Sequence, residues 1–232
     1  MRLFHASVFA VAAALVVPAV HAQRGGAAEQ DEAIKVPNGG IFVTGWMGRP
    51  DSGAVNDARL SQEGADLRVQ TGPAISYWNP ANTASGSYTV KATFTEAKQT
   101  MNHPHPFGVF IGGNDLGTDQ QTLLYCVAYR NGKPLVRGFS GTTSFNILAL
   151  RRQDPPHPAV HIAAADQPVT QEIAWHVMGG TAECLINGQS IGKWDAATTT
   201  GAGKLKSLDG VYGIRVAHNI DVKVSGLSMM KH

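Results

Sequence analysis

Apolar and polar residues alternate along most of the chain from residue 40 onward. In residues 87–98 (SYTVKATFTEAK), the side chains of Tyr88, Val90, Ala92 and Phe94 fall on one face, and polar side chains fall on the other. A period of two residues predicts an antiparallel strand with one buried face and one wet face. Residues 107–112 (FGVFIG) are apolar throughout and predict a second strand.

Short strands of this kind recur at intervals set by turn residues. We expect further strands at 40–49, 65–70, 75–78, 122–130, 135–139 and 145–150, with Asn131-Gly132 forming a hairpin turn. In residues 169–230, four or five apolar runs are separated by Gly-Gly, Asn-Gly, Asp-Gly and His-Asn pairs, which suit tight hairpin turns. No segment after the N-terminal region holds a helical stripe. The pattern predicts an all-β fold, a two-sheet antiparallel β-sandwich of the jelly-roll type.

The N-terminal region has a different pattern. Residues 1–22 have a basic start at Arg2, an apolar core and a Val20-His21-Ala22 cleavage site, which together predict a secretory signal peptide. The apolar core is too short to span a bilayer, so no membrane insertion is expected. Residues 23–38 predict a flexible leader and residues 39–232 the sandwich domain. We expect a bacterial protein that is periplasmic or secreted.

The charge balance excludes one class of partner. Cleavage would leave one fewer than the 19 Lys and Arg of the whole chain, against 17 Asp and Glu, and the longest basic run is Arg151-Arg152. A near-neutral chain without a basic stripe is not typical of nucleic-acid binding. We expect a monomer that does not bind nucleic acid.

Cys126 and Cys184 are the two cysteines of the chain. Export would permit a disulfide between them if their strands are neighbours. Alternatively, both are buried free thiols that act as small apolar residues, since each lies in an apolar strand pattern. The sequence leaves both alternatives open.

The C-terminal motifs resemble those of a known superfamily. The run AWHVMGGTAECLINGQSIG, followed by LDGVYGIRVAHNIDVKVSGLSM, resembles the C-terminal half of concanavalin A-like (laminin G-like) jelly rolls. Gly210, Gly213, Ile214 and Arg215 match its G-x-x-G-[IL]-R motif, and Asn187-Gly188 matches the preceding turn. Gly45-Trp46 and the later GSYTVKATF resemble the branch that includes 3-keto-disaccharide hydrolase domains. The resemblance implies the sandwich fold, which hosts lectins, glycan-cleaving enzymes and adhesion modules alike.

The catalytic pattern of the laminarinase-like enzymes in this superfamily is missing. Those enzymes carry two glutamates and an aspartate at alternating positions of one strand, which brings two carboxyl groups to within about 5 Å. In this chain, Glu63 and Asp66 are three positions apart, and Asp115 and Asp119 are four apart. A retaining pair would have to come from distant strands, which weakens the enzyme hypothesis without removing it.

The His-Pro-His-Pro run is the most unusual local motif. In an extended segment, His103 and His105 point the same way and could share a metal ion or flank a sugar. The alternative is a stiff loop with both imidazoles in solvent, because no third ligand lies at a suggestive spacing. If the protein is an enzyme, His103, His105 and Asp115 are the candidate catalytic groups.

A ligand surface could form around the predicted hairpin at residues 131–132. Arg130 and Arg137 flank this turn, and Trp78, Tyr125 and Tyr129 could join them in an aromatic and guanidinium surface. Sugars stack on aromatic rings and offer hydroxyls to planar donors, so this combination suits a saccharide. Alternatively, the aromatic residues are core and the arginines are solvated.

The loop GGNDLGTD contains Asn114, Asp115 and Asp119, which have the oxygen ligands that calcium prefers. A structural calcium is therefore a candidate cofactor, although Asn and Asp also favour such loops for turn reasons alone.

Three functional hypotheses follow. The first is a non-catalytic module that binds a saccharide or glycan. The second is a hydrolase or lyase acting on glycosides or keto-sugars, as the resemblance to the 3-keto-disaccharide hydrolase branch implies. The third is a structural component of the cell envelope. The sequence leaves open whether the protein is an enzyme.

Overall fold

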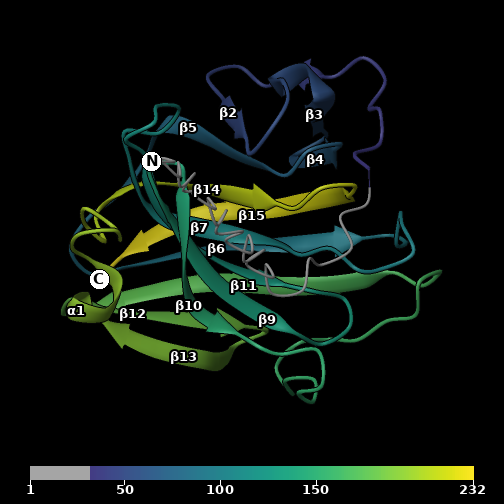
Figure 1. Cartoon of the computed structure of the whole chain (residues 1–232). Helices are drawn as coiled ribbons and strands as arrows, with labels where there is room; N and C mark the ends of the chain where they lie inside the picture. Colours follow the sequence, from purple (N-terminus) through teal and green to yellow (C-terminus); the bar gives the residue numbers. More distant parts are fainter. Residues whose placement is uncertain (1–31) are drawn as a thin grey trace, which may run out of the picture. The chain divides into compact units, whose positions relative to one another are not determined.

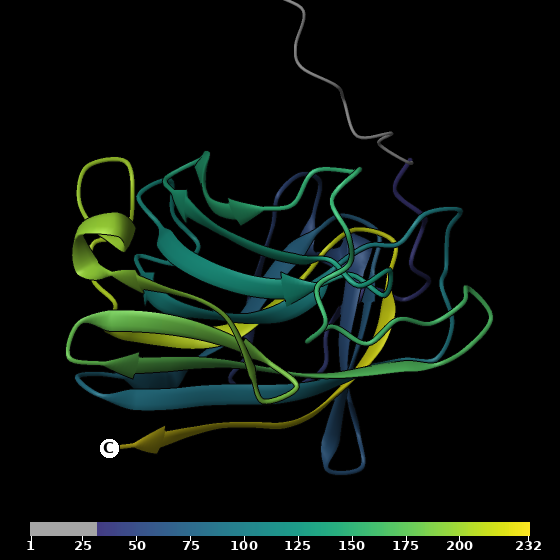
Figure 2. The same cartoon turned by 90° about the horizontal axis from the view of Figure 1, so that it is seen from below.

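A computed structural model describes residues 32–232 as an all-β sandwich of two mainly antiparallel sheets (Figure 1). The predicted signal peptide at 1–22 and residues 23–31 of the predicted leader lie outside the described residues. Figure 2 shows the two layers, with β7–β10 in one layer and β11–β13 in the other. The fold class predicted from the alternation pattern is confirmed.

The first sheet has eight strands in the order β1-β3-β4-β15-β6-β11-β12-β13. Their bounds are β1 (Gly40–Ile41), β3 (Ala58–Glu63), β4 (Asp66–Thr71), β15 (Asp221–Lys231), β6 (Tyr88–Glu96), β11 (Val169–Met178), β12 (Thr181–Ile186) and β13 (Gln189–Asp195). The second sheet has seven strands in the order β10-β9-β8-β7-β14-β5-β2. Their bounds are β10 (Thr143–Ala149), β9 (Pro134–Ser140), β8 (Thr122–Ala128), β7 (Phe107–Asn114), β14 (Gly210–Val216), β5 (Ile75–Ala84) and β2 (Met47–Pro50). A 3-10 turn, η1 (Val55–Asp57), and a short helix, α1 (Ala196–Thr199), complete the described elements.

The core between the sheets follows from the alternation. The apolar residues of β6 face inward as expected, since Tyr88, Val90, Ala92 and Phe94 are all buried. On the neighbouring strand β11, Trp175 is fully buried and its indole N–H donates to the carbonyl oxygen of Val109 in the opposite sheet, at 3.2 Å. The large aromatic side chains therefore pack the two layers together.

A disulfide joins the layers directly. Cys126 on β8 is bonded to Cys184 on β12, and their Cα atoms are 6.2 Å apart. Both cysteines are fully buried, because each points from its own sheet into the shared core. Of the two alternatives that the sequence leaves open, the structure has the disulfide.

The last connection differs from the expected hairpin. Asn219 adopts a left-handed conformation with φ of 58°, as its residue type allows, but β14 and β15 belong to different sheets. The His218-Asn219 turn therefore carries the chain across the end of the sandwich. This crossover brings His218 to the start of β7, because β7 pairs with the end of β14.

The end of the predicted leader lies against the sandwich. Asn219 accepts a hydrogen bond from the backbone N–H of Ile34 at 2.7 Å and donates to the carbonyl oxygen of Glu32 at 3.1 Å. Val36 is only 8% exposed. These hydrogen bonds and the burial of Val36 hold residues 32–38 against the sandwich domain.

No helix among residues 32–232 has the length and apolar character needed to cross a membrane.

Candidate functional site

A second apolar cluster covers the outer face of the seven-stranded sheet. Because neighbouring residues of a strand point to opposite faces, Leu124 and Cys126 face the core between the sheets while Tyr125 faces outward. The buried members of this outer cluster are Trp78, Phe110, Leu123, Tyr125, Val127 and Leu135, and Leu116, Tyr129, Phe139 and Val211 pack around them. The outer face of the seven-stranded sheet therefore carries a cluster of aromatic rings.

Arg215 places a fixed positive charge on this face. Its guanidinium lies 5.3 Å from the ring centroids of both Tyr125 and Phe139, and it forms a bidentate ion pair with Asp51. Burial lowers the pKa of Arg215, but the Asp51 carboxylate outweighs this effect and leaves the pKa raised. Arg215 is therefore charged and held in place, as bidentate geometry favours.

Arg137 lies beside two phenols of the same cluster. It is the direct cross-strand neighbour of Tyr125, and its Nε donates to the side-chain oxygen of Asn146 at 2.6 Å. Burial raises the pKa of Tyr125 and of Tyr129, and the nearby Arg137 partly opposes each shift. Both phenols thus stay neutral donors near a guanidinium.

A cavity of about 340 Å³ opens where this outer face meets the β8–β9 hairpin. Its lining comprises His103, Pro104, Tyr129, Asn131, Lys133, Pro134, Leu135, Arg137, Ala149, Leu150 and Arg152. None of these described lining residues is Asp or Glu, whereas Lys133, Arg137 and Arg152 are cationic. Tyr129 also places an aromatic side chain in the wall of this cavity. We refer to it as the basic cavity.

The structure divides the residues that the sequence suggested as a ligand surface. Tyr129 and Arg137 line the basic cavity, and Tyr125 and Trp78 belong to the same outer cluster but are only 4% and 3% exposed. The aromatic ring of Trp78 lies next to Gly117 of the loop between β7 and β8.

Arg130 takes a different direction, although it follows Tyr129 in the chain. It is 1% exposed and forms an ion pair with Glu96 of the other sheet. A buried, paired guanidinium has no surface to offer a sugar, so we leave Arg130 out of the site.

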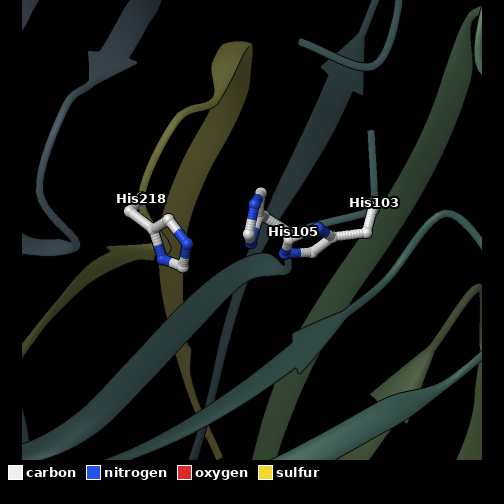
Figure 3. Close-up of side chains that lie close together, drawn as sticks. All are labelled: His103, His105 and His218. Carbon is white, nitrogen blue, oxygen red and sulfur yellow. The ribbon is translucent and has the colours of Figure 1, made fainter. Parts of the chain in front are cut away.

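Three histidines converge beside the basic cavity (Figure 3). His103 and His105 come from the segment before β7, and His218 comes from the turn between β14 and β15. Each offers one ring nitrogen, and these nitrogens all lie within 4.8 Å of one another. The sequence suggested a pair, and the structure adds the third member. Within residues 32–232, this is the one group of three His, Cys, Asp or Glu side chains close enough to share an ion.

The acidic loop has its charges paired with basic side chains. Asp115 forms an ion pair with Lys206, and Asp119 accepts from Arg49 at 2.8 Å. The amide nitrogen of Asn114 donates to the carbonyl oxygens of Gly112 and Asp209. Asp115 also lies apart from the basic cavity, so it does not join the two histidines with which it was grouped as a candidate. A calcium site in this loop stays a prediction.

Several members of the site are not evident from the sequence. Arg152 belongs to the longest basic run, Arg215 to a fold motif and His218 to a turn pair, and none of these patterns indicates a ligand site. Lys133 and Asp51 belong to no pattern that indicates one. The pairing of β7 with β14, which brings His218 toward His105, depends on strand order and is not encoded in any local motif.

Comparison with known proteins supports the fold and does not identify a family. No protein-family model matches the sequence, and no curated protein matches it significantly. A carbohydrate binding module, CBM66 from Bacillus subtilis, superposes with a TM-score of 0.54 at 8% identity, over 82% of this chain and 98% of that one. A Bacillus subtilis protein of unknown function with a galectin-like fold gives a TM-score of 0.50 at 13% identity, over 80% of this chain and 89% of that one. The shared feature is the two-sheet β-sandwich fold.

Proposed function

We propose that the protein is an exported, non-catalytic carbohydrate-binding module that takes a saccharide into the basic cavity. The observation that carries this proposal is the placement of Tyr129 and Arg137 in one wall of that cavity. An aromatic ring accepts the C–H face of a sugar, and a planar guanidinium donates to neighbouring hydroxyls. The outer cluster packs against Tyr129, and the side-chain oxygen of Asn146 accepts a hydrogen bond from Arg137, so both side chains have fixed partners.

The charge of the cavity points to an anionic saccharide. Lys133, Arg137 and Arg152 line it together with His103, and no described lining residue is acidic. The Lys133 ammonium already donates to the carbonyl oxygens of Arg151 and Arg152, so it is fixed near the wall. Carboxylate or sulfate groups on a sugar form strong, charge-assisted hydrogen bonds with such donors.

Two further observations support the proposal. The neighbour with a TM-score of 0.54 is itself called a carbohydrate binding module. The Cys126–Cys184 disulfide suits an oxidising compartment, which agrees with the export predicted from residues 1–22.

The lining also bears on catalysis. A retaining glycosidase needs two carboxyl groups about 5 Å apart at the scissile bond. The described lining of the basic cavity supplies none, which favours binding without turnover. Hydrolysis of the 3-keto-disaccharide hydrolase type and a purely structural role in the cell envelope are the competing hypotheses, and one experiment separates all three.

The test is a glycan array followed by titration calorimetry with the strongest ligand and analysis of the sugar after incubation. We expect binding of a carboxylated or sulfated glycan without product release. Arg137→Ala should weaken binding by about tenfold to a hundredfold, because a hydrogen bond to a charged group contributes about 1.5–3 kcal/mol. Arg68→Ala is the matched control, since Arg68 lines a different cavity on the other sheet.

The other outcomes decide against the proposal. Released product would favour the hydrolase. An array without any bound glycan would favour the structural role. Equal losses in the Arg137 and Arg68 variants would place the ligand outside the basic cavity.

A further inference from the structure

The backbone holds the three histidines at one end of the sandwich. His103 and His105 are separated by Pro104 and followed by Pro106, and proline restricts the backbone of its own residue and of the one before it. The carbonyl oxygen of Pro106 accepts from the backbone N–H of Ala217 at 2.9 Å, which ties this segment to the residue before His218.

The turn that carries His218 is anchored from the other side as well. Asn219 donates its backbone N–H to the carbonyl oxygen of Gly72 at 3.1 Å, and its side chain bonds to residues 32 and 34. The strand pairing of Phe107 with Val216 fixes the two segments relative to each other. The backbone positions of His105 and His218 are therefore determined before any ligand arrives.

The three rings cluster around His105, which lies between its neighbours in Figure 3. The ring centroids of His103 and His105 are 4.5 Å apart, and those of His105 and His218 are 3.9 Å apart. Imidazole nitrogens bound to one tetrahedral zinc at about 2.1 Å would be about 3.4 Å from one another. Since the ligand nitrogens here all lie within 4.8 Å, small rotations of the rings would bring them to that spacing.

We propose that His103, His105 and His218 bind a divalent transition-metal ion of the zinc class. Imidazole ligands suit Zn²⁺, Cu²⁺ and Ni²⁺, whereas Ca²⁺ and Mg²⁺ prefer oxygen. The three ligands come from two segments about 110 residues apart in sequence, which the pairing of β7 with β14 brings together. The ion would thus cross-link the start of β7 to the β14–β15 turn.

Three protein ligands leave a position open on a four-coordinate ion. His103 is the member that also lines the basic cavity, and it is half-buried, whereas His105 is only 6% exposed. The open position would then be reached from the His103 side and filled by water or by an oxygen of a bound ligand. The metal proposal does not depend on the saccharide proposal, because it rests on the histidines alone.

The test is isothermal titration of the untagged full chain with ZnCl₂ alone, near pH 7.5, supported by the visible absorption of the Co²⁺-loaded protein. We expect one tight site per chain and the absorption of an ordered, tetrahedral cobalt ion. His103→Gln should weaken binding at least tenfold by removing one of three ligands, and Zn²⁺ should therefore raise the melting temperature of this variant less than that of the parent.

A matched control comes from another pair of histidines. His176 and His232 have ring centroids 5.2 Å apart, and both bond to the hydroxyl of Thr89. The double variant His176→Gln/His232→Gln should bind Zn²⁺ as the parent does.

His105→Gln and His218→Gln complete the series, with circular dichroism to verify folding. If the buried His105 variant does not fold, His103→Gln decides the question, because its side chain lies in a half-buried loop. Equal Zn²⁺ affinity in the parent and in His103→Gln would overturn the proposal, as would loss of the site in the His176/His232 variant.

Discussion

The guanidinium Nη1 of Arg130 lies 3.0 Å from Oε2 of Glu96, and the two side chains are 1% and 2% exposed. Glu96 ends β6 of the eight-stranded sheet, while Arg130 begins the β8–β9 turn of the seven-stranded sheet. Arg130 also donates to the carbonyl oxygens of Ala164, at 2.5 Å, and Gln167. One buried side chain thus joins both layers and the loop that precedes β11.

Removal of Arg130 should be strongly destabilising. Arg130→Met would leave the Glu96 carboxylate buried without its partner, which typically costs about 3–5 kcal/mol of unfolding free energy. The matched control is Arg68→Met, because Arg68 pairs with Asp221 on the surface at 43% side-chain exposure and should cost less than about 1 kcal/mol. Urea denaturation measures both. Similar losses in the two variants would contradict the role of burial.

Glu96 should also make stability depend on pH. Burial raises its pKa from 4.5 to about 7, although Arg130 opposes the shift. Between about pH 4.5 and about pH 7, the folded state holds a proton that the unfolded state has lost. The contribution of Glu96 to the free energy of unfolding is therefore largest below about pH 4.5 and is lost as pH rises through about 7. The decrease should reach about 3 kcal/mol at most. Glu96→Gln should flatten this part of the pH profile, measured by urea denaturation from about pH 4.5 to about 8. An unchanged slope would show that Glu96 is not its source.

The disulfide should contribute to the free energy of unfolding by an amount similar to that of the Arg130–Glu96 pair. Cys126 and Cys184 are 58 residues apart, and closing such a loop in the unfolded chain is worth about 4 kcal/mol in the chain-entropy model. The double variant Cys126→Ala/Cys184→Ala should therefore melt at a lower temperature than the oxidised parent. Reduction of the parent should lower its melting temperature to a similar degree and leave the variant unaffected. A variant sensitive to reductant would point to another cause.

Much of this fold is predictable because local chemistry and tertiary packing agree. β6 alternates with little error, and the Asn131-Gly132 and Asn187-Gly188 turns form where the sequence predicts them, with positive φ at Gly132, Asn187 and Gly188. Two features are not predictable in this way. β3 has a mixed ARLSQE sequence and forms because β4 supplies a partner. β5 continues through Asn79-Pro80 to Ala84, beyond the expected end at residue 78.

The candidate site is less predictable than the fold. Tyr129 and Arg137 lie near each other because one hairpin connects them, so their neighbourhood follows from the local sequence. Arg130 was expected beside them, but strand alternation turns it toward Glu96 in the opposite sheet. His218 reaches His105 only through the order of strands in the sheet, and strand order is set by long-range packing that no local motif records.

The charge of the basic cavity should be visible in the salt dependence of saccharide binding. Arg152 is exposed at its rim, whereas Tyr129 contributes an apolar ring. The Debye length falls from about 10 Å at 0.1 M salt to about 3 Å at 1 M, so affinity for an anionic glycan should fall over this range. Arg152→Gln should lower both the affinity and its salt dependence, because one long-range attraction is lost.

Tyr129→Ala should lower the affinity but keep the salt dependence of the parent, because stacking is not screened. Calorimetry at several salt concentrations checks both expectations, and an Arg152 variant with the salt dependence of the parent would place the anionic group elsewhere.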